Sequence, residues 1–115
     1  MSKRVELLQE AIELTSGDRN RDYGDPYENH CTIACIFNAM TGHSLTAADI
    51  VKVHIATKMA RMRTSPGKDD NYIDLMAYAG ILKECEDELR NAKAARTTMW
   101  SVLTSFLRAT RGATR

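Results

Sequence analysis

Residues 25–42, DPYENHCTIACIFNAMTG, contain a complete set of signals for one α-helix. Asp25 is a natural N-cap, and Pro26 suits the first helical position because it has no N–H to satisfy there. Glu28, three residues after the cap, completes the pattern of a capping box, and Gly42 is typical of the position after a helix end. Apolar residues at helical spacing lie between these ends, namely Ile33, Ile36, Phe37 and Met40. The sequence therefore predicts a helix that buries this face.

The same pattern recurs along the rest of the chain. Apolar residues at helical spacing mark four further segments, which are about 3–15, 47–62, 69–90 and 97–109. Gly17 follows the first of them, Thr46 precedes the second as an N-cap, and the breaker Ser65-Pro66-Gly67 precedes the third. The sequence shows no strand-like alternation and no hairpin signal. It predicts an all-α fold, a compact bundle of four to five helices in which the polar run 91–96 separates the last two.

The composition limits the class of protein. The 115 residues are enough for one domain, and 43% hydrophobic with 27% charged residues is ordinary for a globular chain. No stretch approaches the roughly 20 apolar residues that span a bilayer, and the N-terminus lacks the apolar core of a signal peptide. The three cysteines cannot form a closed disulfide set. We expect a cytoplasmic protein that has no contact with a membrane.

Charge divides the chain into two parts. Residues 93–115 carry five basic residues and no acid, whereas residues 1–92 have a net charge of −4. This division favours attraction between the two parts or between subunits, and the basic charge is too dispersed for us to expect a nucleic-acid partner. We therefore predict a helical domain over residues 1–92 and a basic amphipathic helix over residues 93–115. Five short amphipathic helices leave much apolar surface, so we expect a homo-oligomer with the last helix at its interface.

Acidic residues lie at the start of the predicted segment 69–90. Asp70 and Asp74 are four residues apart and share one helix face, where two like charges destabilise the helix unless a cation neutralises them. Mg²⁺ would suit this role because it prefers carboxylate oxygens and retained water, and Glu28 could complete the set. The alternative is local: Asp69 is a good N-cap, acids in a first turn are favoured by the helix dipole, and Glu28 belongs to a capping box.

Two basic residues, Lys58 and Arg61, lie three apart on the predicted helix 47–62 and so share a face. Phosphate groups suit both side chains, since arginine offers a planar fork of donors and lysine a point charge. The alternative is a solvated face whose aliphatic stems cover apolar surface.

The polar loop 17–25 is longer than a helix connector requires. It contains alternating charges, an aromatic ring and a glycine at position 17 and at position 24. Such a loop could offer backbone N–H groups, an arginine and a stacking ring to a nucleotide. The residues concerned are Arg19, Asp22 and Tyr23. The alternative is a connector held by salt bridges.

A combination of these motifs resembles a family of small helical proteins encoded by phages and prophages. The resemblance covers about residues 5–85 and rests on Gly17-Asp18-Arg19, Asp22-Tyr23-Gly24-Asp25-Pro26, Glu28-Asn29, Lys58-x-x-Arg61, Asp70-x-x-x-Asp74 and Tyr78. More distantly, a helical bundle with acids opening one helix is similar to the MazG-like all-α nucleoside triphosphate pyrophosphohydrolases. In those enzymes acids on two helices hold Mg²⁺, which binds the triphosphate and activates water. The central helices here lack the Glu-x-x-Glu motif of that group and carry Lys58 and Arg61 instead.

Two hypotheses about function follow. In the first, the protein is a Mg²⁺-dependent nucleotide pyrophosphohydrolase. Its predicted metal-binding and catalytic residues are Glu28, Asp70 and Asp74. Lys58 and Arg61 would hold phosphate and stabilise developing charge, and the loop residues Arg19, Asp22 and Tyr23 would recognise the base or sugar.

In the second hypothesis the same pocket binds without hydrolysis and sequesters a nucleotide signal of host antiviral defence. The basic pair then holds phosphate directly. The polar edges of the ligand are recognised by Asp22, Asn29 and Asn71, and Tyr78 is a further ligand-binding candidate. A third possibility is a structural or DNA-associated accessory protein that uses the basic tail.

Overall fold

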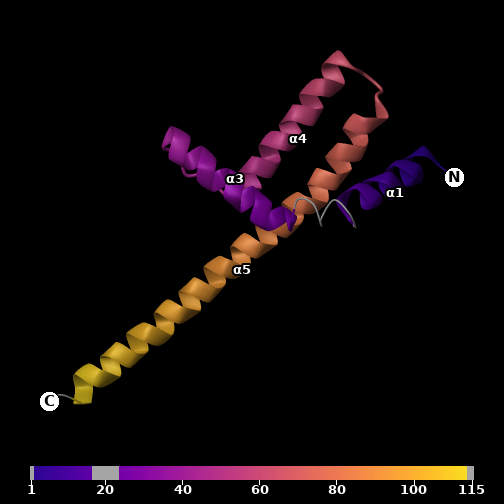
Figure 1. Ribbon diagram of the computed structural model, residues 1–115. Helices are drawn as coiled ribbons and strands as arrows, with labels where there is room; N and C mark the ends of the chain where they lie inside the picture. The colour runs from indigo at the N-terminus through magenta and orange to yellow at the C-terminus, as the bar shows by residue number, and fades with distance from the viewer. Residues whose placement is uncertain (1, 17–23, 114–115) are drawn as a thin grey trace. The chain divides into compact units, whose positions relative to one another are not determined.

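The computed structural model describes residues 2–16 and 24–113 (Figure 1). These ranges contain four α-helices and no strand. The helices are α1 (Lys3–Thr15), α3 (Pro26–Thr41), α4 (Ala47–Thr64) and α5 (Asp69–Ala113). The predicted all-α class is confirmed, and the number of helices in the described ranges agrees with the predicted four to five. In these same ranges, none of the helices is both long enough and apolar enough to cross a membrane.

Local side-chain and backbone signals set the ends of α3 and α4. The carboxylate of Asp25 accepts the backbone N–H of Glu28 at 3.1 Å, as the sequence predicts for an N-cap. Gly42 ends α3 with φ at 77°, a left-handed conformation that glycine adopts without a Cβ clash, and its N–H donates to the carbonyl of Asn38. At the start of α4 the full reciprocal capping box forms, with Thr46 and Asp49 each capping the other's N–H.

The chain divides into two compact units, residues 1–85 and residues 86–115. The first unit buries apolar side chains between its helices. Leu7 and Ala11 of α1 pack with Ile73 of α5, and the partly buried Leu14 and Met76 extend this cluster. α3 also packs against α4. The buried apolar residues of these two helices are Ala34, Ala47, Ala48, Ile50 and Val51.

The predicted apolar face of α3 is largely exposed. Ile36 and Met40 are 57% and 79% exposed, and Phe37 also lies at the surface. The buried residues of α3 are instead His30 and Ala34. They stand four apart and share a helix face, and the small side chain of Ala34 allows a neighbouring helix to approach closely. The prediction was wrong about which face is covered because apolar periodicity identifies a face without identifying what packs on it.

The predicted break at residues 91–96 does not occur, because α5 runs as one helix from Asp69 to Ala113. The sequence of this run, NAKAAR, contains no Gly or Pro, and Ala, Lys and Arg have among the highest helix propensities. A small and polar composition is therefore compatible with helix. The two units divide between residues 85 and 86, whereas the sequence places the domain boundary between residues 92 and 93.

Candidate ligand-binding site

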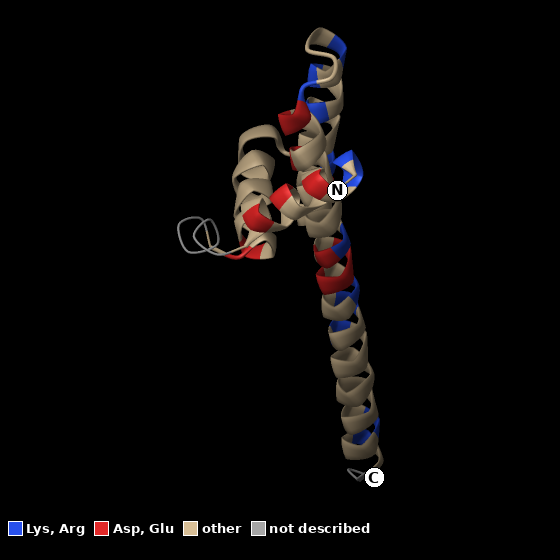
Figure 2. Cartoon of the chain, turned by 90° about the vertical axis from the view of Figure 1, so that its right-hand side faces the viewer, with Lys and Arg blue, Asp and Glu red and all other residues tan. Residues whose placement is uncertain are grey.

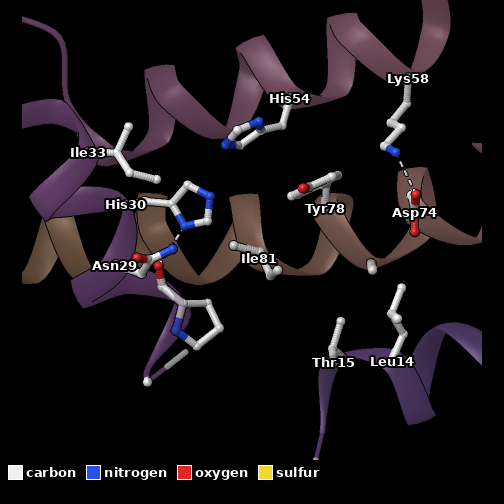
Figure 3. Close-up of a pocket in the computed structure, with 13 residues that line it drawn as sticks. Leu14, Thr15, Asn29, His30, Ile33, His54, Lys58, Asp74, Tyr78 and Ile81 are labelled. Carbon is white, nitrogen blue, oxygen red and sulfur yellow. Dashed lines mark hydrogen bonds and ion pairs between the residues drawn. The ribbon is translucent and has the colours of Figure 1, made fainter. Parts of the chain in front are cut away.

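All four helices of the first unit contribute side chains to one cavity of about 360 Å³ (Figure 3). This volume lies near the lower end of the range for small-molecule sites, roughly 300–1,000 Å³. Apolar side chains form part of the wall, and the remainder is polar or aromatic. The residues that carry chemistry are Thr15, Asn29, His30, His54, Lys58, Asp74 and Tyr78. A cavity with an apolar wall and a few convergent polar groups is the usual form of a ligand site.

One ion pair joins α4 to α5 at this cavity. The Lys58 Nζ lies 2.6 Å from a carboxylate oxygen of Asp74, and Figure 3 shows the lysine side chain extending toward the aspartate. The two side chains are only 16% and 26% exposed. Partial burial reduces screening by water, so this pair is stronger than a fully exposed one. The positive charge of Lys58 is thereby fixed at the cavity wall.

Three rings pack together beside this ion pair. His54 stacks on Tyr78, with ring centroids 5.1 Å apart and planes at 18°, and His30 meets His54 edge to face at 5.3 Å. The Nδ1 of His30 lies 2.6 Å from the Pro26 carbonyl oxygen. Because a carbonyl oxygen only accepts, Nδ1 donates this hydrogen bond. The three rings together offer a flat apolar surface.

Burial lowers the pKa of the His54 imidazole, and the positive charges of His30 and Lys58 lower it further. Protonation of His54 would add a third positive charge to a partly buried cluster. The pKa below 6.5 therefore favours the neutral ring at pH 7.

Four of the residues predicted from sequence come together at this cavity, namely Asn29, Lys58, Asp74 and Tyr78. They come from α3, α4 and α5, so the fold brings together residues that are far apart in the sequence. Thr15 and Gly24, which stand on either side of residues 17–23 in the sequence, also line the cavity. The predicted ligand-binding residues Arg19, Asp22 and Tyr23 lie outside the described residues.

The other predicted residues lie elsewhere. Glu28 is exposed in the first turn of α3, and Arg61 is exposed on α4. Asn71 is buried, with 5% of its surface exposed, and does not line the cavity. Asp70 is exposed and lines a separate hollow.

The residues proposed for magnesium do not form a metal site. Within residues 2–16 and 24–113, no three His, Cys, Asp or Glu side chains lie close enough to hold an ion. Of the predicted set, Asp74 lines the cavity and is held by Lys58, while Glu28 and Asp70 do not line it. The sequence prediction combined two acids that are four residues apart on one helix with a third acid on another helix. The packing of these helices does not bring the three carboxylates together. The set Glu28, Asp70 and Asp74 therefore does not fit a shared Mg²⁺.

Several residues at these sites were not predicted from the sequence. One of them is His54, which lies four residues before Lys58 and hence on the same face of one helix. That spacing was the signal available in the sequence. Glu10 and Glu13, three apart on α1, line the hollow that contains Asp70, and Asp74 lines both this hollow and the cavity.

The fold and cavity describe an all-α protein with a site of ligand size between its helices. Residues 6–86 match the family described as "Domain of unknown function (DUF6378)", and the chain belongs to this family. The match ends within one residue of the boundary of the first unit.

Relatives are encoded by mycobacteriophages, which confirms the predicted relation to phage proteins. The chain is 35% identical over 103 residues to the Gene 55 protein of Mycobacterium phage L5, covering 86% of this chain and 64% of that protein. It is 32% identical over 82 residues to the Gene 55 protein of Mycobacterium phage D29, covering 71% and 54%. The chain thus spans between half and two thirds of the length of these relatives. No solved structure matches the chain.

Proposed function

We propose that the cavity binds a small phosphorylated nucleotide and releases it unchanged, so that the protein sequesters its ligand. The observation that carries this proposal is the convergence of Lys58, Asn29 and Tyr78, from three different helices, on one cavity of ligand size. These residue types supply a cation for phosphate, an amide for polar edges and a ring for a base. The relatives are phage proteins, and a phage would gain by binding a nucleotide that host defence uses as a signal.

In this proposal Lys58 binds phosphate directly. Its ammonium donates charge-assisted hydrogen bonds, which are stronger than neutral ones in a partly buried setting. Asp74 already holds this ammonium, so an incoming phosphate competes with the carboxylate for the same donors. Asp74 thus occupies the donors of Lys58 that would bind the phosphate. It keeps the lysine side chain oriented before a ligand binds, and because it must be displaced it lowers the affinity for phosphate.

The flat portion of the ligand would pack among His30, His54 and Tyr78. These rings line the cavity together with Ile33 and Ile81, which gives a base an apolar and aromatic surface. The amide of Asn29 offers both donors and an acceptor, a combination suited to the edge of a base. A cavity of about 360 Å³ favours a mononucleotide or part of a larger nucleotide over a polymer.

Hydrolysis, as in the MazG-like pyrophosphohydrolases, is the second candidate function. One observation favours it: Glu10, Glu13, Asp70 and Asp74 line a hollow that adjoins the cavity through Asp74 and Leu14. The carboxylates are nevertheless too far apart to form a group that could hold an ion. Binding without hydrolysis agrees better with this arrangement.

A binding experiment separates the two functions. The protein is dialysed against deoxynucleoside triphosphates, cyclic dinucleotides and ADP-ribose-type nucleotides, with and without Mg²⁺, and then denatured. Recovery of an intact nucleotide supports sequestration, whereas monophosphate with pyrophosphate supports the hydrolase. Failure of every nucleotide class to bind, under both conditions, would overturn both.

Two variants test the roles of the ion-paired residues. We expect Lys58→Met to weaken nucleotide binding at least tenfold, about the value of one hydrogen bond to a charged group. Lys52→Met, an exposed lysine on the same helix, is the matched control and should leave affinity unchanged.

Asp74→Asn distinguishes direct from metal-mediated binding. If Lys58 binds phosphate directly, removal of the competing carboxylate maintains or raises the affinity. If a metal bound by Asp74 holds the phosphate, the same variant loses Mg²⁺-dependent binding, and the proposed role of Lys58 is wrong.

A further inference from the structure

Two side chains of opposite charge dominate the electrostatics of the cavity. Among the described residues that line it, Lys58 is the one lysine or arginine and Asp74 is the one carboxylate. They contact each other at 2.6 Å, so the pair has no net charge. Both side chains are mostly buried, and water therefore screens the charge of a bound ligand less than at an open surface. The cavity has one ammonium for phosphate, and its charge is already balanced.

His54 does not supply a second cation at neutral pH. Burial lowers the pKa of its imidazole, and the positive charges of His30 and Lys58 lower it further, so the neutral ring is favoured at pH 7. His30 lies edge to face against His54 at 5.3 Å, and extra protons on both rings would repel each other. A second negative charge on a ligand would therefore find no ready counter-charge on these rings.

Further carboxylates lie close to the cavity. Acidic residues recur along α1 and at the start of α5 (Figure 2). Three of them, Glu10, Glu13 and Asp70, line the hollow that adjoins the cavity through Asp74. Like charges repel across such a short span, and the repulsion grows with the charge of the ligand. The surroundings thus disfavour a highly charged anion.

We propose that the cavity prefers a phosphodiester, which has one negative charge, to a phosphomonoester, which has nearly two at pH 7. This inference rests on the proposed binding of a nucleotide and names its class: a nucleotide whose phosphate is esterified twice, as in a cyclic nucleotide or an internucleotide linkage. When a phosphate displaces Asp74, Lys58 balances one charge. A second charge would be partly buried without a counter-ion, which is costly.

The test compares three nucleotides that share a base, namely the nucleoside 5′-monophosphate, its methyl ester and the 3′,5′-cyclic monophosphate. The first is a monoester and the others are diesters, and the methyl ester keeps the open shape of the monoester. Calorimetric titration at about pH 7.5 without Mg²⁺ measures each dissociation constant for the four common bases. We expect the methyl ester to bind at least about tenfold more tightly than the monoester.

A second titration at about pH 5.5 separates charge from shape. The monoester then takes up a proton, because its second pKa is about 6, and has one charge like its methyl ester. The preference for the methyl ester should largely disappear. Protonation of His30, His54 or Asp74 affects the binding of both ligands, so the ratio of their dissociation constants reports the charge of the ligand. An equal preference at both pH values would overturn the proposal.

Asp74→Asn tests the source of the preference. It removes the carboxylate that balances Lys58, so the affinity for the monoester should rise more than that for the methyl ester. At about pH 7.5 the ratio should fall at least about threefold. Glu88→Gln removes an exposed carboxylate from the same helix and should preserve the ratio. An unchanged ratio in Asp74→Asn would overturn the proposal.

The outcomes distinguish this inference from the proposed function. Where only a larger nucleotide binds, a dinucleotide with and without a terminal phosphate gives the same comparison. Nucleotides that bind without preference for the diester, or triphosphates that bind more tightly than diesters, would overturn the inference and leave nucleotide binding in place. Failure of every nucleotide class to bind would overturn the proposed function and this inference with it.

Discussion

The two parts of α5 differ in what covers their apolar residues. In residues 69–85, Ile73 and Cys85 are 7% and 0% exposed, and Ile73 packs on α1. In residues 86–113, apolar side chains recur at similar helical spacing but are largely exposed, as at Val102 and Phe106. Helical periodicity is thus sufficient to form an apolar face. Burial requires a second element, which α1 supplies to residues 69–85.

The largest expected effect tests this difference directly. Ile73→Ala should lower the free energy of unfolding by about 2–4 kcal/mol, because it removes buried methyl groups and leaves a cavity against Leu7 and Ala11. Leu107→Ala, on the exposed part of α5, should change it by less than about 0.5 kcal/mol. Urea unfolding of both variants gives the two values. Equal losses would show that the second part is as well packed as the first.

Much of the fold could be predicted from local sequence signals. The segment 3–15 matches α1 at both ends, and Asp25, Gly42 and Thr46 cap helices where expected. These signals depend on a few neighbouring residues, so the sequence displays them directly. The incorrect break at residues 91–96 arose from treating a polar composition as a loop, although its residues are good helix formers.

The candidate site could be predicted only in part. Lys58 and Asp74 were each identified by chemistry, but their 2.6 Å contact depends on how α4 and α5 pack, which no local pattern specifies. For the same reason Glu28 was placed in a metal set that the helices do not assemble. Spacing along one helix predicts a shared face. It does not predict which side chain of another helix lies opposite.

A smaller effect is expected from the capping box of the first unit. Thr46→Ala should destabilise the protein by about 1 kcal/mol, because it removes the side-chain acceptor for the Asp49 N–H at the start of α4. Thr98→Ala, in the exposed interior of α5, should be neutral or slightly stabilising, since alanine has the higher helix propensity. Thermal unfolding measures both. Destabilisation by Thr98→Ala would show that the second unit depends on specific side-chain contacts.

The pH dependence of stability should come from the first unit, because residues 86–115 contain no histidine. The pKa of His54 is lowered in the folded state, chiefly by burial, so the unfolded chain takes up its proton more readily. Stability from this group is complete above pH 6.5 and declines as the pH falls through 6.5 toward the folded pKa.

The measurement is the melting temperature between about pH 7.5 and pH 5.5, a range in which histidine is the main titrating side chain. We expect it to fall toward acid pH in the native protein and to fall less in His54→Gln. His43→Gln, at an exposed histidine, is the control and should preserve the native slope. An unchanged slope in His54→Gln would show that the pH dependence has another source.

The smallest effects are expected at surface ion pairs, one of which lies in each unit. Lys3 contacts Asp69 at 2.7 Å and Arg90 contacts Asp87 at 3.2 Å, with both pairs well exposed. The carboxylate of Asp69 raises the pKa of Lys3. Water and salt nevertheless screen exposed ion pairs. Lys3→Ala and Arg90→Ala should therefore each change the melting temperature by no more than the error of measurement. High salt should remove any residual difference. A clear loss in Lys3→Ala that persists in high salt would not come from charge. It would mean that the aliphatic stem of Lys3 covers apolar surface of the first unit, so that packing, and not the ion pair, would account for the effect.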